Sequence, residues 1–150
     1  MGVELIYLTK DFYEDYPQSV YSEILHKNDR PYAVVFIIVD GLEFALPFRS
    51  HIRHQYLFIT DSSHPNDLKG IDYTKAVLIT SPTYKSSSEV RIRQNEFNAL
   101  KGNEYKIMKG FKSYLNQYKK AAKRLDVKRN QTFCKYSSLQ YFHKELGIEP

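Results

Sequence analysis

The side chains best suited to chemistry in this chain gather directly after an apolar, strand-like segment, within the stretch ALPFRSHIRHQY from Ala45 to Tyr56. Two guanidinium groups, two imidazoles and a hydroxyl occupy five of the six positions from 49 to 54: Arg49, Ser50, His51, Arg53 and His54. Like charges at such short spacing repel one another unless an anion lies among them. This cluster therefore predicts an anionic partner.

Cleavage of RNA is one reaction that suits these residues. Arg49 and Arg53 would neutralise a phosphodiester and its trigonal-bipyramidal transition state through charge-assisted hydrogen bonds. A histidine takes up and releases protons near neutral pH, and Ser50 would hold the phosphate or the 2′-hydroxyl. RNA supplies its own nucleophile in that hydroxyl, so the cut needs no metal and leaves a 2′,3′-cyclic phosphate. The residues alone leave three interpretations open: an RNase-like site, a plain phosphate-binding site, and a surface turn without function.

Other site chemistries fit the sequence less well. No carboxylate or cysteine stands beside His51 and His54, and their cationic neighbours disfavour a bound zinc ion. The acidic residues are scattered, so no carboxylate pair is expected near the cluster, and no Gly-rich phosphate loop occurs. The single cysteine, Cys134, excludes an internal disulfide and is expected to be a small core residue. We expect no metal and no other cofactor.

A β-hairpin is expected to position the cluster. Residues 32–39 (YAVVFIIV) are apolar and rich in β-branched side chains, as in a strand covered on both faces. Asp40-Gly41 is a typical two-residue hairpin turn, and residues 42–48 return as the partner strand. The outer ends of two such strands lie side by side, so Arg30 and Tyr32 should lie near the cluster. An ion pair with a carboxylate is an equally good interpretation of Arg30.

The remaining patterns predict an α+β fold, with a small, largely antiparallel sheet or barrel and helices at one end, in a single domain over residues 1–150. Pro47 has no amide hydrogen and marks an edge or a bend in the returning strand. We expect further strands at 56–60 and 75–80, polar loops at 61–72 and 81–89, a strand end leading into a short helix at 90–100, and helices at 10–16, 20–26, 103–125 and from 137 onward.

The helix expected at 103–125 has two distinct faces. Its apolar stripe, stepping by three and four residues, consists of Met108, Phe111, Leu115, Tyr118, Ala122 and Leu125. A lysine ridge runs beside the stripe: Lys109, Lys112, Lys119 and Lys123. Residues 101–135 hold eleven Lys and Arg against two acidic residues, a net +9, whereas the whole chain carries +5. This distribution favours a polyanionic partner, although a solvated helix face explains it equally well.

The sequence also indicates a compartment. The start, MGVELIYLTKDFYED, has acidic residues where a secretory signal would be basic and then apolar. The longest apolar run, at 33–39, is far shorter than the ~20 residues of a membrane helix. We therefore expect a cytoplasmic protein that binds no membrane.

At these residues the chain resembles the RNase toxins of type III toxin–antitoxin systems, the ToxN/AbiQ superfamily, and most closely the Tenp-type (TenpN) branch. The matching stretches are DRPYAVVFIIVDGLEFALPFRSHIRHQY, GIDYTKAVLIT and YSSLQYF. The resemblance implies a compact, distorted SH3-like barrel with added helices, similar to the MazF toxins, and a metal-independent endoribonuclease activity. It also implies a small, pseudoknotted repeat RNA as antitoxin, which the toxin cuts from its precursor and which inhibits it within a protein–RNA assembly. The role would be phage defence by abortive infection, or growth arrest.

The resemblance also assigns roles to single residues. Ser50 falls on the family's essential serine, while His51 and Ile52 stand where the family has proline and lysine. The role of that lysine would pass to Arg53, His54 or His51, and Arg30 matches a basic position near the active centre. We thus expect catalysis by Ser50, His51, Arg53, Arg49 and Arg30, and RNA binding by His54, Tyr32, Lys109, Lys112, Lys119 and Lys123.

Two other functions compete with this one. A non-catalytic RNA-binding module would use the same arginines without His51, and the products of an RNA incubation would distinguish it. A DNA-binding regulator is disfavoured, because no helix-turn-helix spacing occurs.

Overall fold

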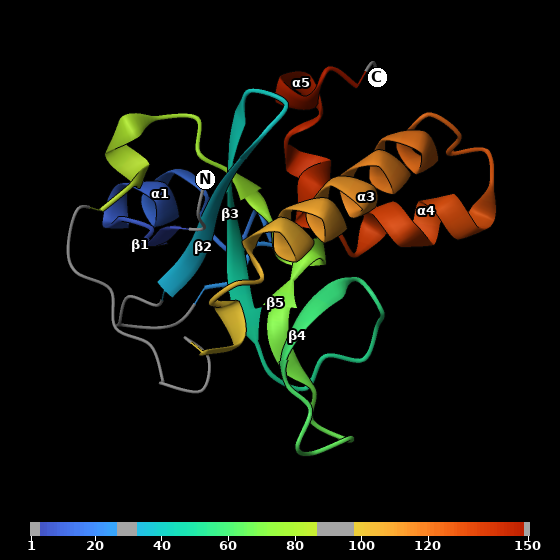
Figure 1. Cartoon of the computed structure of the whole chain (residues 1–150). Coiled ribbons are helices and arrows are strands. Elements are labelled where there is room, and N and C mark those ends of the chain that lie inside the picture. Colours follow the sequence, from blue (N-terminus) through green and yellow to red (C-terminus); the bar gives the residue numbers. More distant parts are fainter. Residues whose placement is uncertain (1–3, 27–32, 87–97, 149–150) are drawn as a thin grey trace.

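A computed structural model describes residues 4–26, 33–86 and 98–148 (Figure 1). The strands in these ranges form one antiparallel sheet in the order β1-β2-β3-β5-β4, with β6 paired to β3. The strands are β1 (Glu4–Tyr7), β2 (Ala33–Val39), β3 (Leu42–Arg49), β4 (Leu57–Asp61), β5 (Lys69–Asp72) and β6 (Val77–Leu78). The helices are α1 (Lys10–Asp15), α3 (Glu104–Ala122), α4 (Lys128–Lys135) and α5 (His143–Leu146), with short 3₁₀ helices η1 (Tyr73–Lys75), η2 (Pro82–Tyr84) and η3 (Ser138–Tyr141). The predicted α+β class with an antiparallel sheet is confirmed.

The predicted hairpin is present as β2 and β3. Asp40 and Gly41 form its turn with φ angles of 53° and 79°, the left-handed conformations that a tight two-residue turn requires. Most of β2 is buried on both faces, as its composition predicts, and Ile38 is the exposed exception. The hairpin thus carries the chain through the core and delivers Arg49 to the far end of the sheet.

Strand β3 is the centre of the sheet. It pairs with β2 along one edge, while its other edge pairs with β6 at Phe44 and Ala45 and with β5 at Phe48 and Arg49. Pro47, which has no amide hydrogen, lies between these two partners. The strand runs one residue past its predicted end, and the bend indicated by Pro47 coincides with a change of partner.

Two short elements lie where the sequence predicts something else. Strand β5 occupies part of the expected loop at 61–72, and the expected strand at 75–80 shrinks to β6, preceded by η1. Gly70 is the physical reason for the first difference: a Cβ atom there would overlap the carbonyl oxygen of Phe58. The glycine that indicates a loop in the sequence is therefore a point of close strand approach.

The helices differ from expectation in three places. Residues 20–26 form turns rather than a helix, and α4 was not expected, because its eight residues carry no apolar period. The helix expected from residue 137 is divided into η3 and α5, and Leu139, Phe142 and Leu146 are buried as predicted. Of the strand end and short helix expected at 90–100, residues 90–97 lie outside the described residues, and residues 98–100 are helical.

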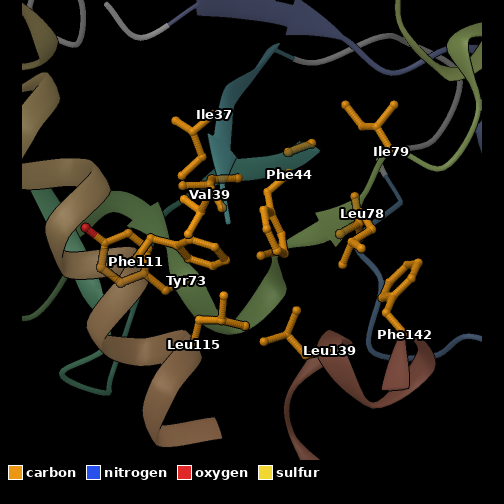
Figure 2. Close-up of a cluster of buried hydrophobic side chains, with 14 of the residues drawn as sticks. Ile37, Val39, Phe44, Tyr73, Leu78, Ile79, Phe111, Leu115, Leu139 and Phe142 are labelled. Carbon is orange, nitrogen blue, oxygen red and sulfur yellow. The ribbon is translucent and has the colours of Figure 1, made fainter. Parts of the chain in front are cut away.

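Helix α3 confirms the predicted helix and closes the core. Phe111 and Leu115 are fully buried and, as Figure 2 shows, face Val39 and Phe44 of the hairpin. Leu125, the last member of the expected stripe, lies beyond the helix and is exposed. No helix in the described part of the chain combines the length and the apolarity needed to cross a membrane.

Candidate functional site at the end of strand β3

A buried carboxylate lies at the centre of the cationic cluster. Asp72, the last residue of β5, has no solvent exposure and accepts a hydrogen bond from Arg49 Nη1 at 2.7 Å. His54 Nε2 lies 3.0 Å from the other carboxylate oxygen, which also accepts hydrogen bonds from the Thr74 backbone N–H and hydroxyl. We expected no carboxylate pair near the cluster, and two single carboxylates contact it instead, Asp72 at Arg49 and His54 and Asp67 at His51. The protein itself supplies an anion for Arg49 and His54.

These donors control the protonation of Asp72. Burial alone would raise the pKa of its carboxyl group, but the hydrogen bonds from His54 and Thr74, together with Arg49, outweigh burial and lower the pKa to about 2. Asp72 is therefore ionised near neutral pH. It acts as a fixed internal counter-ion and orients the Arg49 guanidinium, which remains one-third exposed.

The ring of His54 is held through both nitrogens. Its Nδ1 accepts the backbone N–H of Tyr56 at 3.0 Å, so the neutral ring carries its proton on Nε2, where it is donated to Asp72. The ring also stacks on Tyr56, with centroids 6.0 Å apart. This arrangement gives His54 a positioning role and leaves neither nitrogen free for a substrate.

Ser50 and His51 form an exposed pair at the rim of the site. Ser50 Oγ lies 3.2 Å from His51 Nδ1, and Asp67 Oδ1 accepts the His51 backbone N–H at 2.8 Å and lies 3.4 Å from the same Nδ1. The hydroxyl and the carboxylate thus approach one ring nitrogen, unlike the relay of a serine hydrolase, where they engage different nitrogens. The imidazole is 67% exposed, and no described residue bonds its Nε2.

The backbone of His51 is unusual. Its φ angle of 57° lies in the left-handed region, which costs a non-glycine residue roughly 1 kcal/mol. The next residue, Ile52, is buried and anchors the turn through a backbone hydrogen bond to Leu68. The buried isoleucine and the bond from Asp67 fix the conformation that places His51 on the rim.

Arg53 is the least restrained cation of the cluster. Its side chain is exposed, and no carboxylate among the described residues lies within ion-pair distance of it. Arg49, by contrast, is partly neutralised by Asp72. Arg30 and Tyr32, expected in this corner, lie outside the described residues.

Lys112 of the lysine ridge lies far from the cluster. Lys112 lies 3.5 Å from Asp40 in the hairpin turn, at the end of β3 opposite Arg49 (Figure 1). Strand β3 separates the two ends by about 23 Å, at ~3.3 Å per residue. Lys109 and Lys123 are exposed, whereas Lys119 is half-buried. The sequence could not show this separation, because it depends on how α3 crosses the sheet.

A cavity of about 300 Å³ opens beside the cluster. Arg49 and His54 line one side of it, and Tyr56 and Phe133 contribute aromatic rings. Sequence reasoning missed Phe133 and Asp72. One signal was present for Asp72: an aspartate two residues before a threonine, here Asp72 and Thr74, is typical of a turn in which the carboxylate caps the backbone.

No protein-family model, curated protein or solved structure matches this chain. In the three described ranges, no group of three or more His, Cys, Asp or Glu side chains is placed to hold a metal ion. Function must therefore be inferred from the chemistry of these residues.

Proposed function

We propose that this protein is a metal-independent endoribonuclease that uses the 2′-hydroxyl of its RNA substrate as the nucleophile. The observation that carries the proposal is the exposed Ser50–His51 pair, with Oγ 3.2 Å from Nδ1 and the outer ring nitrogen facing away from both Asp67 and Ser50. In the reaction the O2′–P bond forms and the P–O5′ bond breaks. The 2′ proton passes to a base, and another proton is given to the leaving 5′-oxygen. The products are a 2′,3′-cyclic phosphate and a 5′-hydroxyl.

Each residue of the cluster has a role in this proposal. His51 transfers protons, and Ser50 holds the 2′-hydroxyl or the phosphate. Arg53 stabilises the phosphorane, assisted by Arg49 and by Arg30. Because Asp72 already compensates much of the Arg49 charge, Arg53 should supply the larger part of this stabilisation. His54 orients Arg49 and Asp72, and Tyr32 would contact RNA, whereas Lys112 of the lysine ridge lies 3.5 Å from Asp40, at the other end of β3.

The family resemblance supplies the biological context of the proposal. The protein would be a TenpN-type toxin of the ToxN/AbiQ superfamily, acting in the cytoplasm on cellular or phage RNA. A small repeat RNA would be processed by the toxin and would inhibit it, giving phage defence or growth arrest when released. The change of partner along β3 supports the further proposal that the sheet is a distorted SH3-like barrel, because closure of a small sheet requires such a bend.

The test is an incubation of the purified protein, in EDTA, with a structured precursor RNA and with an unrelated messenger RNA. We expect fragments that end in 2′,3′-cyclic phosphate and that disappear with Ser50→Ala. Fragments that form only after magnesium is added, or an unchanged yield from Ser50→Ala, would contradict the mechanism.

A non-catalytic RNA-binding module is the second candidate. The rigid Arg49 and the aromatic cavity beside it favour this candidate, because they would hold a phosphate and a base without any proton transfer. Intact RNA that still shifts on a gel would support it over the nuclease.

A further inference from the structure

The cavity beside the cluster adjoins a second, larger one. The second cavity, of about 620 Å³, lies between α3 and α4 and shares Tyr56 and Phe133 with the first. The two shared rings meet edge to face, with centroids 5.2 Å apart. We call these two adjoining cavities, whose linings run from Arg49 to Arg129, the α3–α4 groove.

Cations line the outer part of this groove. Lys120 projects from α3, Arg124 follows the end of that helix, and Arg129 lies on α4. Arg124 is held by Asp126 through two hydrogen bonds of 3.0 Å, whereas no described carboxylate pairs with Lys120 or Arg129. The groove therefore has aromatic rings at its inner end and unpaired positive charge at its outer end.

The lysine ridge lacks this combination. Lys112 and Lys120 are eight residues apart, which places them about 80° from each other around the helix. Lys112 faces the hairpin turn and Asp40, while Lys120 faces the groove and α4. None of the four ridge lysines lines either cavity.

We propose that a single-stranded RNA leaves the cleavage site along the α3–α4 groove and not over the lysine ridge. A splayed base would stack on Tyr56 or Phe133, and the following phosphates would contact Lys120, Arg129 and, less strongly, Arg124. Aromatic stacking platforms flanked by cations are the usual means of holding single strands without reading their sequence. This inference rests on the proposed RNA binding at the same site.

The test compares two charge reversals of equal size. Lys120→Glu with Arg129→Glu alters the groove, and Lys112→Glu with Lys119→Glu alters the ridge, because these two lysines lie about 80° and 100° from Lys120 around α3. The probe is a 2′-O-methylated single strand of mixed sequence, which lacks the nucleophile, and its binding is measured across a salt series. We expect the groove variant to lose at least about tenfold in affinity at low salt and to flatten the log–log salt slope by about 1.4, since each single-strand phosphate contact contributes ~0.7. The ridge variant should bind like the unaltered protein.

Other outcomes separate the inference from the proposed function. If only the ridge variant lost affinity for the probe, or if both variants lost it equally, the proposed path along the groove would be wrong, although RNA binding itself would stand. If the unaltered protein binds no RNA at any salt concentration, the proposed function fails and the inference fails with it.

A second variant is expected to bind RNA more tightly. Asp126→Asn removes the carboxylate that engages Arg124 and should tighten binding by about two- to fivefold through one more phosphate contact. Glu14→Gln is the matched control, because it makes the same change in net charge and frees Lys10 from an exposed pair on α1. Equal affinities for the two variants would count against the groove.

Discussion

The two halves of the cationic cluster have similar side chains and opposite environments. Arg49 and His54 are bound to the buried Asp72, whereas Ser50, His51 and Arg53 lie exposed on the rim. The protein therefore neutralises much of one half through a buried carboxylate and leaves the other half exposed at the surface. A cluster of positive charges in a sequence indicates only that these charges need anions nearby. The fold determines how many of those anions are carboxylates of the protein itself.

The largest effect should come from the rim. His51→Asn should lower the rate of RNA cleavage by about 10²- to 10⁴-fold, the usual contribution of a proton-transfer group. Its unfolding free energy should stay within about 0.5 kcal/mol, because asparagine tolerates the left-handed backbone that residue 51 adopts. Cleavage assays and urea unfolding on the same preparation measure both quantities.

His64→Asn is the control for this variant, because it removes an exposed imidazole from the loop between β4 and β5. If His51→Asn kept more than half of the cleavage rate, the proposed role of His51 in proton transfer would be wrong.

The buried half should show the reverse pattern. Asp72→Ala should lower the unfolding free energy by about 2 to 3 kcal/mol, because the Arg49 guanidinium and the donors from His54 and Thr74 lose their partner. Asp67→Ala, which removes the rim carboxylate, should cost less than about 1 kcal/mol. Thermal unfolding of the two variants measures both changes in unfolding free energy. Equal decreases would show that the buried half and the rim do not differ in how their carboxylates stabilise the fold.

Acid should destabilise the buried half selectively. The pKa of Asp72 falls from 3.8 to about 2 on folding, so its ionised form contributes stability above about pH 4. That contribution, of about 2 kcal/mol, is lost as the pH falls from 4 through 2. Urea unfolding between pH 2 and pH 6 should show this loss in the unaltered protein and a shallower dependence in Asp72→Ala. If the unfolding free energies of the two proteins fell in parallel with pH, Asp72 would not be the source of the acid sensitivity.

The sequence was sufficient where one signal dominated locally. Asp40-Gly41 between two apolar runs predicted the hairpin, and the spacing of Phe111, Leu115 and Tyr118 predicted α3. Each of these elements is determined by neighbouring residues, through turn geometry or helical periodicity.

The sequence was insufficient where long-range packing decided the outcome. Strand β5 carries a lysine and a glycine and forms because its backbone fits closely against β4. Asp72 therefore reaches Arg49, 23 residues earlier, through an element that propensity does not predict. The exposed rim was identified from residue types alone, but its counter-ions and its aromatic cavity were not.

The smallest effect should come from Asp67, which acts on the rim through His51. Its carboxylate accepts the His51 backbone N–H at 2.8 Å and so helps to hold the left-handed turn. Asp67→Ala should reduce kcat about fivefold with little change in KM, since one hydrogen bond is worth about 1 kcal/mol and touches no substrate. Asp67→Asn keeps a carbonyl oxygen in place for that N–H and should restore most of the rate. If asparagine failed to rescue, the charge of Asp67 and not its hydrogen bond would be what His51 requires, and the rim would share with the buried half its dependence on an internal anion.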